Sequence, residues 1–113
     1  MSKITTHVLD ISLGRPASNI SVILEAQSST GAWVETARGV TDSDGRLQNL
    51  SAEESLPAGK YRLTFGTGLY FAQRKIANLY PQVTITFEVN EANGHYHIPL
   101  LLSPFGYSTY RGS

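Results

Sequence analysis

Apolar and polar residues alternate over much of the chain, and this two-residue period is typical of strands that bury one face. The alternation is clearest over residues 20–26, 60–65 and 83–89. Residues that favour turns separate these segments from their neighbours. The pattern predicts about eight strands, over residues 4–11, 20–26, 33–40, 60–65, 83–89, 95–102 and 105–110, with a very short one beginning at 46–47.

One segment departs from this period, because its apolar residues recur at the spacing of a helix. These residues are Leu69, Ala72, Ile76 and Leu79. We therefore predict a single short helix over residues 69–76, which Thr67 caps and which ends before Pro81. Strands at regular spacing with one short helix indicate an all-β, two-sheet β-sandwich. No linker or repeat divides the chain, so we expect a single domain over residues 1–113.

Three segments between the strands are predicted to be loops or turns. Residues 14–17 (GRPA) are expected to form a loop, and Asp44-Gly45 a tight turn. Asn93-Gly94 is the dipeptide typical of a hairpin turn, so the flanking strands are expected to pair with each other.

Composition excludes several classes of partner and chemistry. Nine basic and nine acidic residues give zero net charge, so we expect neither nucleic acid nor a membrane surface as a partner. The chain has no cysteine, which excludes disulfides, thiol nucleophiles and thiolate metal sites. No apolar stretch approaches the ~20 residues of a membrane span. We see no signal peptide and expect a cytoplasmic protein.

The strand over residues 95–102 places two histidines on one face. Side chains alternate across a strand, so Tyr96 and Ile98 are expected to face the core while His95 and His97 face outward. Apolar Pro99 and Leu101 share the outer face with these histidines. Such a mixture indicates a pocket or a subunit interface.

His7 lies on the outer face of the first predicted strand, beside Leu9. His7 and His97 therefore converge if both outer faces belong to one sheet. Three roles are open to them. They are structural or interface residues, they bind a metal, or they transfer protons near neutral pH. No third ligand accompanies His95 and His97 at a suitable spacing, so we expect neither a metal nor a cofactor.

Sequence blocks along nearly the whole chain resemble the motifs of the transthyretin-like protein family. They are residues 6–10 (THVLD) with 14–17 (GRPA), residues 41–46 (TDSDGR), residues 95–104 (HYHIPLLLSP) and residues 107–113 (YSTYRGS). The family contains the thyroid-hormone carrier transthyretin and a branch that hydrolyses 5-hydroxyisourate. His7, Arg46, His97 and the end Tyr110-Arg111-Gly112-Ser113 resemble the marks of the 5-hydroxyisourate hydrolase branch.

The resemblance implies a transthyretin-like sandwich that assembles as a homotetramer, a dimer of dimers with active sites at the dimer–dimer interface. It implies hydrolysis of 5-hydroxyisourate to 2-oxo-4-hydroxy-4-carboxy-5-ureidoimidazoline in urate degradation, by attack of water on the ring amide. The alternative is a transthyretin-like carrier that binds a small aromatic ligand in the tetramer channel. That alternative predicts lysine-type channel residues and a longer tail than the one ending at Ser113.

The resemblance also supplies candidate catalytic residues. We interpret His97 as the general base and His7 as a partner that positions water or relays the proton, and the sequence leaves these two roles exchangeable. Arg46 offers a planar donor fork to the substrate and to the oxyanion. Ser113 and its carboxylate accept hydrogen bonds from the substrate or orient a histidine. The substrate-binding set comprises His7, Arg46, Tyr110, Arg111, Gly112 and Ser113, in which Tyr110 shapes the pocket and Arg111 binds substrate or holds the terminus.

Overall fold

The structure is a computed structural model that describes residues 3–48, 50, 56–90 and 94–113. Within these residues the elements follow the order β1 (Lys3–Asp10), β2 (Arg15–Pro16), β3 (Ser21–Gln27), β4 (Trp33–Val40), β5 (Arg46–Leu47), β6 (Gly59–Phe65), α1 (Thr67–Gln73), β7 (Val83–Val89), β8 (His95–Ser103) and β9 (Gly106–Thr109). The prediction of an all-β fold with one short helix is confirmed.

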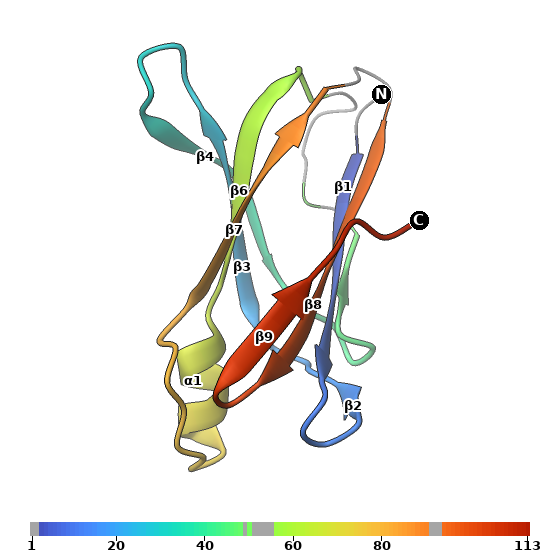
Figure 1. The fold of residues 1–113 in the computed structure, drawn as a ribbon, viewed down its shortest axis with the longest axis vertical. Helices are drawn as coiled ribbons and strands as arrows, with labels where there is room; N and C mark the ends of the chain where they lie inside the picture. Colours follow the sequence, from blue (N-terminus) through green and yellow to red (C-terminus); the bar gives the residue numbers. More distant parts are fainter. Residues whose placement is uncertain (1–2, 49, 51–55, 91–93) are drawn as a thin grey trace.

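The strands form two sheets that pack face to face (Figure 1). The five-stranded sheet has the order β2-β1-β8-β9, with β5 also paired to β1, and the four-stranded sheet has the order β4-β3-β6-β7. Strands β1 and β8 are parallel neighbours, although they come from opposite ends of the chain. A parallel pair needs a long crossover, and here the whole four-stranded sheet lies between the two strands in sequence.

The predicted hairpin at Asn93-Gly94 is wrong. Strand β7 pairs with β6 in the four-stranded sheet, whereas β8 pairs with β1 and β9 in the other sheet. The chain therefore crosses between sheets after β7 instead of turning back along it. Asn93 itself lies outside the described residues.

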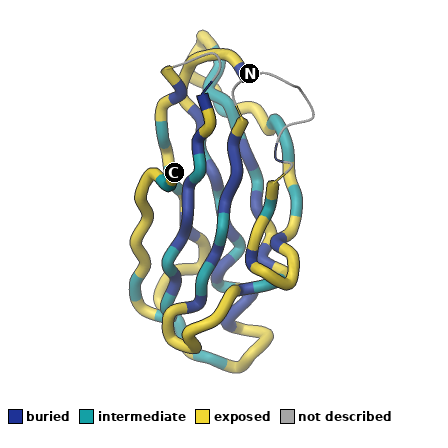
Figure 2. The backbone as a smooth tube through the Cα atoms, turned by 90° about the vertical axis from the view of Figure 1, so that its right-hand side faces the viewer, coloured by how far each residue is buried: buried dark blue, intermediate teal, exposed yellow. Residues whose placement is uncertain are grey.

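The core fills the space between the two sheets. Buried positions run through the middle of the strands, while the loops at both ends are exposed (Figure 2). In β8, Tyr96, Ile98, Leu100 and Leu102 are buried, as the alternation predicts. His95 is exposed and His97 is half-buried, so both lie on the outer face of the five-stranded sheet.

The helix differs from its prediction in bounds, cap and buried face. α1 begins at Thr67 and ends at Gln73, and its N-cap position is Gly66, without a side-chain cap. Leu69 is 65% exposed, whereas Tyr70 and Phe71 are buried. The prediction placed the buried face on Leu69, because Leu69 and later apolar residues recur at helical spacing. The packing contacts are instead made by the adjacent aromatic rings of Tyr70 and Phe71.

Residues 14–17 were predicted to be a loop, but Arg15–Pro16 form the two-residue strand β2 against β1. Leu9 of β1 pairs with Pro16, and Asp10 pairs with Arg15. A two-residue strand at a sheet edge is too short to produce an alternating pattern, so periodicity does not detect it.

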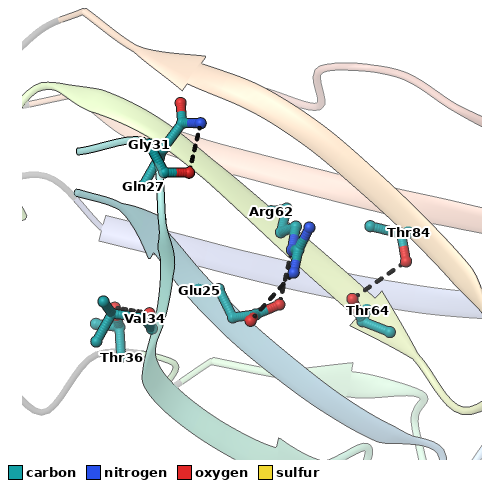
Figure 3. Close-up of polar contacts among 8 residues, drawn as sticks. All are labelled: Glu25, Gln27, Gly31, Val34, Thr36, Arg62, Thr64 and Thr84. Atoms are coloured by element: carbon teal, nitrogen blue, oxygen red, sulfur yellow. Dashed lines mark hydrogen bonds and ion pairs between the residues drawn. The ribbon is translucent and has the colours of Figure 1, made fainter. Parts of the chain in front are cut away.

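The outer face of the four-stranded sheet carries polar contacts between neighbouring strands (Figure 3). Arg62 donates to Glu25 at 2.8 Å, and the Thr64 and Thr84 hydroxyls lie 3.2 Å apart. The Arg62 guanidinium also lies 4.4 Å from the centre of the Trp33 ring. These cross-strand pairs satisfy one another, which leaves the outer face of the five-stranded sheet as the place to look for a site. No helix among the described residues is long and apolar enough to cross a membrane.

Candidate functional site

The parallel register of β1 and β8 brings the histidines to one surface. Thr5 pairs with His97, and His7 pairs with Pro99, one step further along the strands. Because residues two apart share a face, Thr5 and His7 of β1 lie on the same outer face as His95 and His97 of β8. The two outer faces therefore belong to one sheet, as the convergence of His7 and His97 requires.

A tight turn holds Arg46 next to His7. The Asp42 carboxylate accepts the backbone N–H groups of Asp44 at 2.9 Å and Arg46 at 3.0 Å. Gly45 has a φ of +74°, and a Cβ there would lie 2.3 Å from the Val8 carbonyl oxygen, so this position requires glycine. The turn thus docks on β1, where Arg46 pairs with His7 in the antiparallel register of β1 and β5.

The same turn fixes the ring of His7. Its Nε2 lies 2.9 Å from the Asp44 carbonyl oxygen. A carbonyl oxygen only accepts hydrogen bonds, so Nε2 of His7 carries the proton and donates. In the neutral ring the lone pair is then on Nδ1. His7 is not among the residues that line the pocket described below.

The hydrogen bonding and the pKa of His97 suit a neutral ring that accepts a proton. Its Nδ1 lies 2.8 Å from the hydroxyl of Thr5, which also lies 3.1 Å from Nε2 of His95. The pKa of His97 is lowered from its ordinary value of 6.5, first by burial and then by nearby cationic groups at His7, His95 and Arg46. The ring is therefore neutral at neutral pH, with one nitrogen available as a base.

The C-terminal tail is bound along the edge of β8. Gly112 forms an isolated antiparallel bridge with His97, and its N–H donates to the His97 carbonyl at 2.8 Å. A Cβ at Gly112 would lie 2.5 Å from Cδ2 of the His97 ring. The tail therefore crosses directly over the histidine, and it needs glycine at this point (Figure 1 shows the C-terminus beside this sheet).

Three of the predicted catalytic residues border one pocket of about 250 Å³. They are Arg46, His97 and Ser113. The pocket is also lined by Lys3, Thr5, Thr6, Gln48 and His95, which were not assigned to the site from the sequence. Thr5 shares the period-two face of His7, so the alternation contained a signal for it. Lys3 and Gln48 carried none, because a single polar residue near a strand end is usually solvated.

Tyr110 and Arg111 lie at a neighbouring hollow of about 230 Å³. There the Arg111 guanidinium lies 4.4 Å from the centre of the Tyr96 ring, and Tyr110 is 58% exposed. Within one chain the Arg111 side chain packs on this aromatic ring of β8 and donates to the His95 carbonyl oxygen at 3.4 Å. Tyr110 does not line the pocket of Arg46 and His97 in the single chain.

The pocket combines a neutral histidine, a planar cationic donor and the polar residue Ser113. These groups are able to activate water, to stabilise an oxyanion and to accept hydrogen bonds from a small polar molecule. Among the described residues, no three His, Asp or Glu side chains cluster in a way that would hold a metal ion. The arrangement suits the hydrolysis of a compact, hydrogen-bonding substrate.

Comparison with known proteins gives a family and relatives with named activities. The model of the HIUase/Transthyretin family matches residues 4–112. A Salmonella typhimurium protein named 5-hydroxyisourate hydrolase is 43% identical over 110 residues, which cover 97% of this chain and 80% of the relative. The structure of Klebsiella pneumoniae 5-hydroxyisourate hydrolase superposes with a TM-score of 0.88 at 41% identity, covering 100% of both chains.

Sea bream transthyretin in complex with thyroxine has a TM-score of 0.92 at 32% identity, covering 97% of this chain and 94% of that one. Backbone similarity is therefore high to a carrier as well as to a hydrolase, and it does not separate the two. Sequence identity is higher to the proteins named as hydrolases. The choice between the activities depends on the side chains of the pocket.

Proposed function

The chain belongs to the HIUase/Transthyretin family, and on this premise we propose that it hydrolyses 5-hydroxyisourate to 2-oxo-4-hydroxy-4-carboxy-5-ureidoimidazoline. It is an enzyme, a cyclic amide hydrolase of urate degradation. Relatives named 5-hydroxyisourate hydrolase are 43% and 42% identical to it, over 97% and 98% of this chain. The observation that carries the proposal is the grouping of His97, Arg46 and Ser113 around one small pocket.

His97 is the proposed general base. Its lowered pKa keeps the ring neutral at neutral pH, so it accepts a proton from water as the water oxygen attacks the ring carbonyl. The C–N bond of the cyclic amide then breaks, and the leaving nitrogen takes up a proton. His7 lies on the same face and holds the Asp44 turn, and we assign it to water positioning or proton return.

Arg46 and Ser113 bind the reacting part of the substrate. The Arg46 guanidinium presents two parallel donors to a carbonyl and to the oxyanion that replaces it. Ser113 supplies a hydroxyl, which accepts a hydrogen bond from a ring N–H group. Gly112 permits the tail to lie against the His97 ring. Tyr110 and Arg111 complete the proposed binding set from the neighbouring hollow.

We also propose that the working form is a homotetramer. Much of the pocket is formed by exposed residues, among them Arg46, His95 and Ser113, so a single chain leaves the site open on one side. A second copy placed over the outer face of the five-stranded sheet would cover it and exclude bulk water. The family relationship supports such an assembly.

The direct experiment adds the protein to freshly generated 5-hydroxyisourate and follows the decay of its ultraviolet absorbance. We expect a decay much faster than the spontaneous one, with first-order dependence on enzyme concentration. A decay no faster than the spontaneous one would refute the proposal. Calorimetric titration with thyroxine tests the carrier alternative, which requires saturable binding without turnover of 5-hydroxyisourate.

A further inference from the structure

The Thr5 hydroxyl connects two histidines in the wall of the pocket. Its Oγ1 lies 2.8 Å from Nδ1 of His97 and 3.1 Å from Nε2 of His95. Thr5 is only 6% exposed, so these rings are its polar environment and not incidental surface neighbours. His95 lies at the exposed end of β8. The three groups therefore form a line from the half-buried His97 to solvent.

Two arrangements of this line use the Thr5 hydroxyl proton within it when both rings are neutral. A hydroxyl donates one hydrogen bond and accepts up to two, and in both of these arrangements Thr5 donates to one ring and accepts from the other. If Thr5 donates to His97, then Nδ1 of His97 is the acceptor and its Nε2 is protonated. If Thr5 donates to His95, then His97 carries its proton on Nδ1 and presents an unprotonated Nε2.

Of these two arrangements, the second makes His97 a base at Nε2. Among the described residues, none forms a hydrogen bond with Nε2 of His97, whereas Nδ1 is engaged by Thr5. The free nitrogen belongs to a ring that lines the pocket together with Arg46 and Ser113. A base whose second nitrogen is held by an orienting group is the arrangement common to acid–base sites.

Building on the proposed hydrolase activity, we propose that Thr5 and His95 form a proton relay that fixes the tautomer of His97 and carries its proton to solvent. The three proton transfers balance without any further reactant. Nε2 of His97 takes a proton from the attacking water as the new C–O bond forms. The Nδ1 proton of His97 moves to Thr5 Oγ1, and in the same step the Thr5 proton moves to Nε2 of His95.

After this step His97 is neutral again, Thr5 keeps its hydroxyl, and His95 carries the positive charge. Because His95 is exposed, water stabilises that charge better than the half-buried position of His97 does. The reverse shift returns the proton for the leaving nitrogen, or His95 releases it to solvent. The charged and titratable groups around the relay are Lys3 and His7 on β1, Arg46 on β5 and Arg111 on the tail.

Two variants test the relay in the intact protein. Thr5→Val keeps the shape of the side chain and removes the hydroxyl, while Thr5→Ser restores it. We expect Thr5→Val to lower kcat by about 10- to 100-fold with little change in KM, less than the about 10²–10⁴-fold cost of losing a general base. Thr5→Ser should recover most of the loss. Thr67→Val is the matched control, because it removes a buried hydroxyl from α1, outside the pocket, and should leave kcat unchanged.

His95→Gln separates proton relay from simple positioning. The glutamine amide still accepts a hydrogen bond from Thr5 but cannot hold a proton at neutral pH. The relay predicts a fall in kcat similar to that of Thr5→Val. Full activity of His95→Gln, or full activity of Thr5→Val, would overturn the proposal.

A measurement without substrate keeps this test independent of the proposed activity. Nitrogen-15 NMR of the free protein, above the pKa of both rings, reports which nitrogen of His97 is protonated. We expect the Nδ1–H form in the wild type and a shift toward Nε2–H in Thr5→Val. A wild-type His97 protonated on Nε2 overturns the relay even if the protein hydrolyses 5-hydroxyisourate. An inactive wild type with His97 in the Nδ1–H form overturns the proposed function but not the tautomer assigned to His97.

Discussion

Three kinds of neighbour set the pKa, the hydrogen bonding and the packing of the His97 side chain. Burial and nearby cationic groups lower its pKa, the Thr5 hydroxyl holds Nδ1, and the tail lies over the ring at Gly112. Each neighbour comes from a different segment, so the properties of His97 are a result of the fold and not of its local sequence.

The lowered pKa predicts where activity is lost in acid. A base must be unprotonated, and kcat/KM reports the pKa of the free enzyme. Because the pKa of His97 is lowered from 6.5, kcat/KM should fall to half of its plateau only at a pH below 6.5. The measurement is kcat/KM against pH after subtraction of spontaneous decay. A half-maximal point at or above 6.5 would contradict the assignment of His97 as the base.

Arg46 is expected to act through the shape of its guanidinium as well as its charge. Arg46→Lys keeps the charge but replaces the planar fork by a point donor. We expect kcat/KM to fall by about 10²-fold, the lower end of the cost of removing one oxyanion donor. Arg38→Lys on the exposed face of β4, where Arg38 pairs with Glu35, is the control and should change nothing. Equal activity of the two lysine variants would remove Arg46 from the site.

Alternation predicted which face of β8 carries the histidines, because the two-residue period fixes the side of each residue once the strand is known. It did not predict that β1 and β8 are parallel neighbours, since that pairing joins residues about 90 apart in sequence, as Thr5 and His97 are. The contact between Gly112 and His97 was invisible for the same reason. The resemblance supplied these residues as a set, and the structure adds how they meet.

At the scale of elements, the tail acts as an additional short strand on β8. Gly112→Ala tests this, because the new methyl group would meet the His97 ring at 2.5 Å. We expect a loss of kcat of about 10-fold or more from displacement of the base, with an unfolding free energy that changes little. Gly106→Ala in β9 is the matched control, since its methyl would meet only the Ser103 hydroxyl at 3.7 Å. Unchanged kcat in Gly112→Ala would show that the tail does not position His97.

The helix is tied to the five-stranded sheet by one buried polar contact. The Tyr70 hydroxyl of α1 donates to the Asp10 carboxylate of β1 at 2.8 Å, and Asp10 is 0% exposed. Burial raises the pKa of Tyr70 to about 12, and the hydrogen bond to Asp10 adds to this shift. Burial alone would raise the pKa of Asp10, but hydrogen bonds from Ser12, Tyr70 and Leu13 outweigh it and lower the pKa below 3.8.

This contact predicts a pH-dependent contribution to stability. The contribution of Asp10 to the unfolding free energy is present above pH 3.8 and is lost as the pH falls through the lowered pKa of the native state. The contribution of Tyr70 is present below pH 10 and is lost as the pH rises through about 12. Tyr70→Phe should lower the unfolding free energy by about 1.5–3 kcal/mol at pH 7, as for a hydrogen bond to a charged group. The difference from wild type should shrink in acid. Denaturant titrations at several pH values measure it, and a constant difference would contradict the role of Asp10.

At the scale of the whole molecule, the two sheets have different surfaces. The outer face of the four-stranded sheet is closed by cross-strand polar pairs such as Glu25 with Arg62 (Figure 3). The outer face of the five-stranded sheet instead combines histidines with the half-buried Leu9 and Leu101, which pair with each other. Zero net charge offers little repulsion between copies. This asymmetry favours association through the five-stranded sheet.

We therefore expect sedimentation to give a particle of about four times the 12.3 kDa chain mass at micromolar concentration. Leu101→Glu, which places a charge on the outer face without entering the core, should dissociate this particle and lower kcat/KM while strand content is retained. On dilution, kcat/KM and the fraction of assembled protein should decrease over the same concentration range, because in the separated chain no second copy covers the pocket. A stable 12.3 kDa species with full activity would contradict the tetramer and would place the complete active site within one chain.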